Sequence, residues 1–293
     1  MAVSKSESRY SRLRRDSETE AARFPALLAE AERIAATIAH GVHGRRQAGS
    51  GETFWQYRFY HNQDSAQSID WRRSARDDNL YVRETERDSS NAVFFWADNG
   101  QGMTLPSAHR HTKNERGVVC LMALASLLSR GGERVGAVGA GRARSGQFGL
   151  QRTARVLADG QTGVDEIEAA NMPRYARLVL ASDFLDPIET WQARLSKLST
   201  RGIRGALVHV IAPEEEDFPF QGRTRFKAPE AATPLVFGRA QDIRQAYREQ
   251  WARHMHDLTT LARQYGFILV HHRIDKPAAS AVLALYQALS GDL

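Results

Sequence analysis

Residues 92–98 have the sequence Ala-Val-Phe-Phe-Trp-Ala-Asp, an apolar run that ends in a carboxylate. A short continuous apolar run predicts a strand that is buried on both faces, as in a parallel sheet. In open α/β sheets, ligands bind beside the carboxyl ends of such strands. We therefore expect residues 92–98 to form the first central strand of a sheet, with Asp98 at the edge where a site lies.

The segments after this strand alternate between strand and helix patterns. Apolar runs predict strands at 134–139, 177–183, 205–211 and 267–272, and helical spacing predicts helices near 113–130, 150–158, 163–170, 187–200, 239–265 and 276–290. An irregular excursion over 213–238 holds four of the nine prolines. We expect its acidic run Glu214–Asp217 to be a solvated face or a cap, or to contact the basic segment 101–156 of the same or another molecule. This alternation predicts an α/β fold, with a mainly parallel sheet and helices on both faces.

The N-terminal part of the chain lacks this alternation. Residues 1–23 are polar, charged and without periodicity, so we expect a disordered segment. Residues 24–90 combine a helix, predicted over about 24–41, with a small β-rich module. The strands of this module are predicted where polar and apolar side chains alternate, at Trp55–Tyr60 and Leu80–Glu86. Residues 91–293 then form the sheet domain.

The composition argues against a membrane or secreted protein. No run of 18 apolar residues is present, so we expect no membrane-spanning helix. Residues 1–16 lack the apolar segment of a secretory signal. The single cysteine, Cys120, excludes an intrachain disulfide and favours a reducing compartment. We therefore expect a cytoplasmic location and no membrane partner.

The net charge of +6 is unevenly distributed along the chain. Residues 44–90 contain eight Arg and eight acidic side chains, so that segment is neutral. Residues 101–156 contain nine Lys and Arg against Glu115 and Glu133, a net charge of +7. Such a segment forms either a solvated basic face or a surface for a polyanion, and the sequence leaves both interpretations open.

Two carboxylates directly follow predicted strands, Asp98 and Asp183. Thr162 lies between them in the sequence, in a turn before a short predicted helix. If the two strands are neighbours, the three side-chain oxygens converge at the carboxyl-end rim of the sheet. Oxygen ligands of this kind suit a hard cation such as magnesium. The same acids would also serve as helix N-terminal caps, where negative charge is favourable, so both interpretations stay open.

Six short motifs are distinctive in combination. They are Gly-Val-His-Gly-Arg-Arg (41–46), Gly-Glu-Thr-Phe (51–54), Ile-Asp-Trp-Arg-Arg-Ser-Ala-Arg (69–76), Ser-Asp-Phe-Leu (182–185), Pro-Glu-Glu-Glu-Asp-Phe-Pro-Phe-Gln-Gly (213–222) and His-Arg-Ile-Asp-Lys-Pro (272–277). Together they resemble the bacterial domain-of-unknown-function family number 58 over about residues 24–290. The resemblance implies a von Willebrand factor A-like, Rossmann-like domain.

In that superfamily the metal site opens with Asp-x-Ser-x-Ser after the first strand. Here Asp98 is followed by Asn, Gly100, Gln and Gly102, with glycine at both serine positions. We therefore expect a degenerate metal site at Asp98, Thr162 and Asp183 and no cofactor, with bound magnesium as the alternative. The two glycines permit the backbone of a protein partner to approach closely.

The stretch Asp70-Trp71-Arg72-Arg73-Ser74-Ala75-Arg76 combines an aromatic ring with one acidic and three basic side chains. Asp70, Trp71, Arg72 and Arg76 are candidates for a bidentate ion-pair network between the β-rich module and the sheet domain. They are equally candidates for a partner-binding surface, because Trp and Arg are enriched at binding hot spots.

Motifs for several enzyme classes are missing from the sequence. There is no Gly-x-x-x-x-Gly-Lys-Ser/Thr, no Gly-x-Ser-x-Gly, and the loop 139–144 lacks the third glycine of a dinucleotide fingerprint. We expect a non-enzymatic protein. The resemblance implies an adaptor that works with a MoxR-type AAA+ ATPase in the assembly or maturation of a protein complex. The alternative is a polyanion or nucleic-acid binder acting through residues 101–156, although we regard nucleic acid as the weaker of these expectations.

Overall fold

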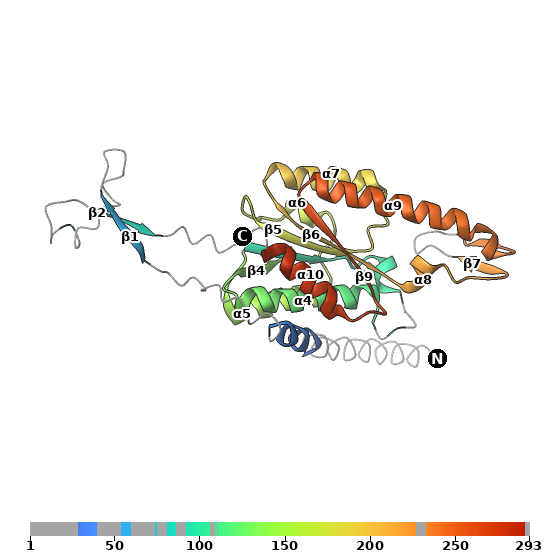
Figure 1. Cartoon of the computed structure of the whole chain (residues 1–293), viewed down its shortest axis with the longest axis horizontal. Helices are drawn as coiled ribbons and strands as arrows, with labels where there is room; N and C mark the ends of the chain where they lie inside the picture. The colour runs from blue at the N-terminus through green and yellow to red at the C-terminus, as the bar shows by residue number, and fades with distance from the viewer. Residues whose placement is uncertain are drawn as a thin grey trace, which may run out of the picture. The chain divides into compact units, whose positions relative to one another are not determined.

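The computed structural model of the chain (Figure 1) describes residues 29–39, 54–59, 74, 81–85, 92–105, 109, 111–226 and 233–290. The chain divides into two compact units. One comprises Met1–Gly44 with Asn91–Leu293, and the other is Arg45–Ser90.

The first unit is built on a five-stranded sheet in the described part of the chain. Its strands are β3 (Ala92–Ala97), β4 (Arg134–Ala137), β5 (Arg177–Ser182), β6 (Arg204–Ile211) and β9 (Phe267–Arg273). The spatial order is β4-β3-β5-β6-β9, and every neighbouring pair is parallel. The prediction of a mainly parallel α/β sheet is confirmed.

Helices cover both faces of the sheet (Figure 1). The helix at residues 29–39 packs on one face with α4 (Lys113–Arg130), α5 (Gly146–Asp159) and α10 (Ala278–Ser290). The other face carries α6 (Glu166–Ala169), α7 (Ile188–Thr200) and α9 (Arg244–Gln264). Strand β3 serves both layers, because Val93 and Phe95 lie in the first core and Phe94 and Trp96 in the second. This alternation explains why its sequence is continuously apolar.

Most predicted elements appear within a few residues of their expected bounds. The exception is α5, which begins at Gly146 rather than near residue 150. Gly149 sits where a Cβ would lie 2.1 Å from the Arg144 carbonyl oxygen, so this turn of the helix tolerates only glycine. Glycines are poor helix formers, and they conceal the start of this helix in the sequence.

The excursion at 213–238 is more ordered than expected. It contains α8 (Pro213–Asp217) and an antiparallel pair, β7 (Thr224–Phe226) and β8 (Leu235–Phe237). The rings of Phe218, Phe220, Phe226, Phe237 and Tyr247 contact one another in a chain. This aromatic cluster fixes the hairpin beside the 3-10 turn η2 (Ala240–Ile243) and α9, so the expectation of an irregular segment is wrong for its described part.

In the second unit, β1 (Phe54–Phe59) and β2 (Tyr81–Thr85) pair in antiparallel fashion, as the alternating side chains predict. Asp70, Trp71, Arg72 and Arg76 lie outside the described residues, as do residues 1–23. The β-rich module as a whole, the paired arginine network and the disordered terminus therefore stay predictions.

In the described part of the chain, no helix is both long enough and apolar enough to cross a membrane. Cys120 lies within α4 and is fully buried in the core, where burial raises the pKa of its thiol to about 12.

Candidate functional site

The order of the strands creates a switch point in the sheet. β3 is flanked by β4 on one side and β5 on the other, so the connections that leave β3 and β4 run in opposite directions. In such sheets the crevice beside the carboxyl ends of the two central strands is the usual ligand position. Asp98 follows β3 and Asp183 follows β5, so both predicted carboxylates lie at this rim.

Asp98 is held by groups of its own loop and of β5. Ser182 Oγ donates a hydrogen bond to Asp98 Oδ2 at 2.5 Å, and the Gly100 N–H donates to Oδ1 at 2.8 Å. The amide of Asn114 donates to the Asp98 carbonyl oxygen at 2.7 Å. Burial raises the pKa of Asp98 above its ordinary value. The hydrogen bonds from the Ser182 hydroxyl and the Gly100 backbone N–H oppose this rise, and the nearby charges of Asp183 and Asp186 add to it.

Asp183 is paired with a lysine that the sequence did not single out. Lys113, the first residue of α4, places Nζ 2.8 Å from Asp183 Oδ2 and 2.5 Å from Glu215 Oε1. Glu215 Oε2 accepts a hydrogen bond from the Ala212 N–H at 2.8 Å. Burial alone lowers the pKa of Lys113, but the two carboxylates outweigh it and raise the pKa overall, so the ammonium stays charged.

The acidic run at 214–217 is partly solvated and also binds cations of other elements. Glu215 both caps the start of α8 and binds Lys113. The side chains of Glu216 and Asp217 lie 2.9 and 3.0 Å from the guanidinium of Arg273 at the end of β9, and the Asp217 side chain is 54% exposed. The expectation of a cap and the expectation of a contact with the segment 101–156 are both confirmed at Glu215, and the rest of the run keeps a partly solvated face.

The two glycines lie directly against these carboxylates. A Cβ at Gly100 would be 3.1 Å from Asp98 Oδ1, and a Cβ at Gly102 would be 3.2 Å from Asp183 Oδ2. Side chains at positions 100 and 102 would thus reach the acids, which is the geometry that hydroxyl ligands require. In this chain positions 100 and 102 are glycine, so no hydroxyl group lies beside the two carboxylates.

Sequence comparison is consistent with this arrangement of motifs. The model of the family described as protein of unknown function DUF58 matches residues 56–257. The chain belongs to the DUF58 family. No curated protein and no solved structure matches the chain.

In this DUF58 chain the third predicted ligand, Thr162, faces a different group. Its hydroxyl donates to the Val138 carbonyl oxygen at 3.4 Å, and its own carbonyl accepts from Trp96 Nε1 at 3.1 Å. These contacts direct Thr162 toward the end of β4, whereas the contacts of Asp98 and Asp183 lie toward α4 and α8. No hydrogen bond among the described residues joins Thr162 to either aspartate.

The divalent cation that the superfamily resemblance implies does not fit these residues. Lys113 already binds the Asp183 oxygen, two hydroxyl positions are glycine, and Thr162 is bonded to the end of β4. Among the described residues, no group of three or more His, Cys, Asp and Glu side chains is placed to hold a metal.

Behind Lys113 lies a histidine pair at the ends of β6 and β9. His209 is fully buried, and its Nδ1 lies 3.0 Å from Nδ1 of His271. Burial, followed by the charges of His271, His254 and Lys113, lowers the pKa of His209 to about 3. His209 is therefore neutral at physiological pH and cannot carry charge into the rim.

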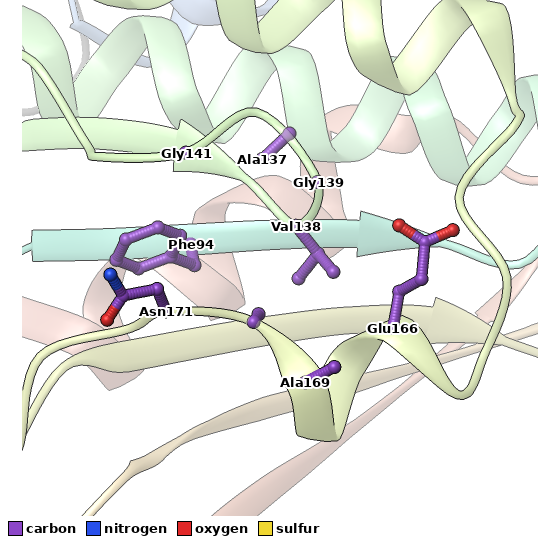
Figure 2. A pocket seen from close by; sticks show the side chains of 9 residues that line it. Phe94, Ala137, Val138, Gly139, Gly141, Glu166, Ala169 and Asn171 are labelled. Carbon is purple, nitrogen blue, oxygen red and sulfur yellow. The ribbon is translucent and has the colours of Figure 1, made fainter.

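A separate pocket lies on the α6 side of β3 and β4 (Figure 2). Its volume is about 250 Å³, and Phe94, Val138, Ala169 and the glycine loop after β4 form its apolar walls. Its polar side chains are Glu166 and Asn171, and Glu166 accepts a hydrogen bond from the Gly163 N–H at 3.1 Å. Small-molecule sites usually enclose about 300–1,000 Å³. We assign no ligand to this smaller pocket.

The basic segment 101–156 is divided by the fold. Lys113 and Arg116 are internal, and Arg116 Nη1 lies 3.4 Å from Glu30 of the helix at 29–39. Arg134 is exposed but has an interaction of its own. The other exposed and described arginines of the segment, together with the exposed ring of Phe148, are what we call the arginine face: Arg130, Arg142, Arg144, Arg152 and Arg155. The guanidinium of Arg144 lies 5.4 Å from the centre of the Phe148 ring. Among the described residues, none of these five arginines forms an ion pair.

Proposed function

We propose that this chain is a non-enzymatic adaptor of the von Willebrand factor A-like type that docks a protein partner on the rim around Asp98, Gly100, Gly102 and Asp183. One observation carries the proposal. The rim acids are bound by the chain's own donors, whereas Leu105 and Leu185, which follow the two rim loops, are 52% and 49% exposed. This surface offers exposed apolar contacts beside the exposed carboxylate of Asp186, whose charge acts on Asp98.

The electrostatics favour a protein partner over a small charged substrate. Lys113 neutralises one of the two carboxylates that contact it, and Ser182 and Gly100 satisfy the oxygens of Asp98. An apolar centre within a polar rim is characteristic of protein–protein interfaces. Leu105 and Leu185 are therefore the proposed anchors.

The partner we propose is a MoxR-type AAA+ ATPase in the cytoplasm, which is the class that the family resemblance implies. The adaptor would present client proteins to this motor during assembly or maturation of a complex. Asp70, Trp71, Arg72 and Arg76 are proposed as partner-binding residues of the β-rich module, on the sequence pattern alone.

The proposal is tested by measuring binding of the purified chain to a purified MoxR-type ATPase from the same genome, with ATP and with ADP. Leu185→Asp should weaken binding about tenfold or more, because it places a charge in a desolvated contact. Leu235→Asp is the matched control, since Leu235 is 66% exposed on β8, outside the rim. Equal affinity of the two variants, or no binding in either nucleotide state, would contradict the proposal that the rim binds this partner.

The arginine face supports a second candidate function, a polyanion binder. Five exposed arginines without an ion-pair partner among the described residues are suited to bidentate phosphate contacts. Phe148 is 62% exposed beside Arg144, and basic side chains next to an aromatic ring on which bases can stack are typical of single-strand binders.

This second candidate is tested by fluorescence anisotropy with a labelled 20-nucleotide single strand over a range of salt concentrations. Binding that falls steeply with salt, and falls further in Arg152→Glu but not in Arg253→Glu on α9, would favour it. An unchanged anisotropy at low salt would leave only the adaptor.

A further inference from the structure

Lys113 occupies a position that elementary electrostatics disfavours. It is the first residue of the 18-residue helix α4, and the N-terminus of a helix favours anions rather than cations. Its side chain is only 7% exposed, and burial of an ammonium group costs free energy unless the charge is compensated. A lysine at such a position requires a specific reason.

The compensation comes from two separate elements. Asp183 lies in the loop after β5, and Glu215 lies in α8 after β6. The Lys113 ammonium lies 2.8 Å from an oxygen of the first and 2.5 Å from an oxygen of the second. Thr112 caps the same helix end: its side chain accepts from the Glu115 N–H, while the Glu115 carboxylate accepts from the Thr112 N–H. One cation thus joins three segments that meet at the rim.

Joining carboxylates from different loops is the structural task of a bound metal ion in many proteins. A hard divalent cation holds its oxygen ligands at about 2.0–2.6 Å, only slightly shorter than the two lysine contacts. The ammonium therefore occupies a ligand position at Asp183 Oδ2, an oxygen of one of the three expected metal ligands, and takes Glu215 as its second partner. The Gly102 Cβ position, 3.2 Å from the Asp183 oxygen, marks the side from which a further ligand would arrive.

We infer that the Lys113 ammonium takes the place of the divalent cation that the von Willebrand factor A-like resemblance implies. The expected ion and the ammonium would compete for the Asp183 carboxylate, which the ammonium already binds, so the lysine excludes the metal. The rim carries a tethered cation of its own, and it recognises a partner without metal. The statement on partner recognition rests on the proposed function; the exclusion of metal does not.

The test measures the thermal midpoint of the chain alone in EDTA and in about 10 mM MgCl2 or MnCl2 at constant ionic strength. A cation that binds only the native state must raise the midpoint. The wild-type midpoint should not respond. Lys113→Gln, which removes the charge and leaves two carboxylates facing each other, should gain a metal-dependent rise of about 3 °C or more.

Two further variants make this result specific. Lys197→Gln removes the lysine of an exposed pair, 2.6 Å from Glu168, and should gain no response. The double variant Lys113→Gln/Glu215→Gln should lose the gain, because one of the two acids is gone. If Lys113→Gln does not fold in EDTA, its refolding in MnCl2 becomes the test, and recovery of native structure is the expected result.

Two outcomes would overturn the inference. One is a chelator-reversible rise of the wild-type midpoint that Asp183→Asn abolishes, since metal would then bind despite the lysine. The other is a Lys113→Gln protein that neither responds to metal nor refolds with it. Because no partner is present, either outcome is independent of whether the adaptor proposal holds.

Discussion

The rim and the arginine face both draw on the basic segment 101–156, yet their charges have opposite surroundings. At the rim, Lys113 is buried between two carboxylates, and Arg116 nearby contacts Glu30. On the arginine face, Arg152 and Arg155 are exposed and form no ion pair with any described residue. The net charge of +7 in residues 101–156 therefore has two parts: one stabilises the fold, and the other is available to a ligand.

The sharpest way to break this comparison is Lys113→Ala. Removing one partner of a buried ion pair leaves uncompensated charge, so we expect a loss of about 3–5 kcal/mol in the free energy of unfolding. The raised pKa means that this contribution is complete below pH 10.5, the ordinary lysine value, and is lost as the pH rises through the folded-state pKa. Urea unfolding at pH 7.5 measures it.

Lys197→Ala is the control for that measurement, because Lys197 is 66% exposed beside Glu168. Exposed pairs contribute about 0–1 kcal/mol. Similar losses in the free energy of unfolding for the two variants would mean that the Lys113 ion pair contributes no more than an exposed one.

The next effect is acid destabilisation through His209. Its folded pKa of about 3 lies below the ordinary value of 6.5, so the unfolded chain binds the proton first and stability falls as the pH drops from 6.5 toward 3. The expected slope is up to about 1.4 kcal/mol per pH unit. His271, His254 and Lys113 face this ring, and their charges oppose its protonation.

Urea unfolding between pH 7.5 and 5 measures this slope. His209→Gln should flatten it, while His256→Gln, at an exposed position of α9, should leave it unchanged. A slope that is the same in all three proteins would show that His209 is not the group responsible.

A smaller effect is expected from Asp98→Asn. Because the folded pKa of Asp98 is raised, mainly by burial, its charged form is disfavoured in the native state. The amide removes that cost, so the variant should equal or exceed the wild type in stability at pH 8 by about 0–1 kcal/mol. The difference should shrink as the pH falls and the wild-type carboxyl becomes protonated. A large loss at pH 8 would instead assign the Asp98 charge a stabilising role.

The smallest effect on stability belongs to the arginine face. Arg152→Glu and Arg155→Glu should each change the free energy of unfolding by less than about 0.5 kcal/mol, since neither side chain forms an ion pair within the described part of the chain. If this face binds a phosphate backbone, each should also lower the salt dependence of binding by about one unit of slope. A strongly destabilised Arg152→Glu would show that Arg152 stabilises the fold, as Lys113 does, and would contradict the comparison.

Most of the sheet domain could be predicted from the sequence, because its signals are local. The apolar run at 92–97 and the alternation after it depend on periodicities of two and 3.6 residues. The start of α5 at Gly146 could not, because a close backbone approach, rather than helix propensity, requires Gly149. The order within 213–238 depends on ring contacts between residues up to 29 positions apart, from Phe218 to Tyr247, which no local pattern reports.

The site was predicted only in part. Asp98 and Asp183 lie at the rim because strand ends are predictable, and both glycines lie beside them. Lys113 and Glu215 were missed as a pair, because 102 residues separate them in the sequence. The one local signal was a lysine directly after the helix cap Thr112, where a cation is unfavourable. Ser182 was part of a recognised motif, but its bond to Asp98 depends on the pairing of β3 with β5.

The central claim is that a lysine holds the rim where a metal would otherwise lie. The most direct measurement is a crystal structure of the wild-type chain grown in MnCl2, with anomalous data at the manganese edge. The account predicts Lys113 Nζ between Asp183 and Glu215 and no anomalous peak within about 4 Å of either carboxylate. A manganese peak bound to Asp98 or Asp183, with Lys113 turned away, would contradict it.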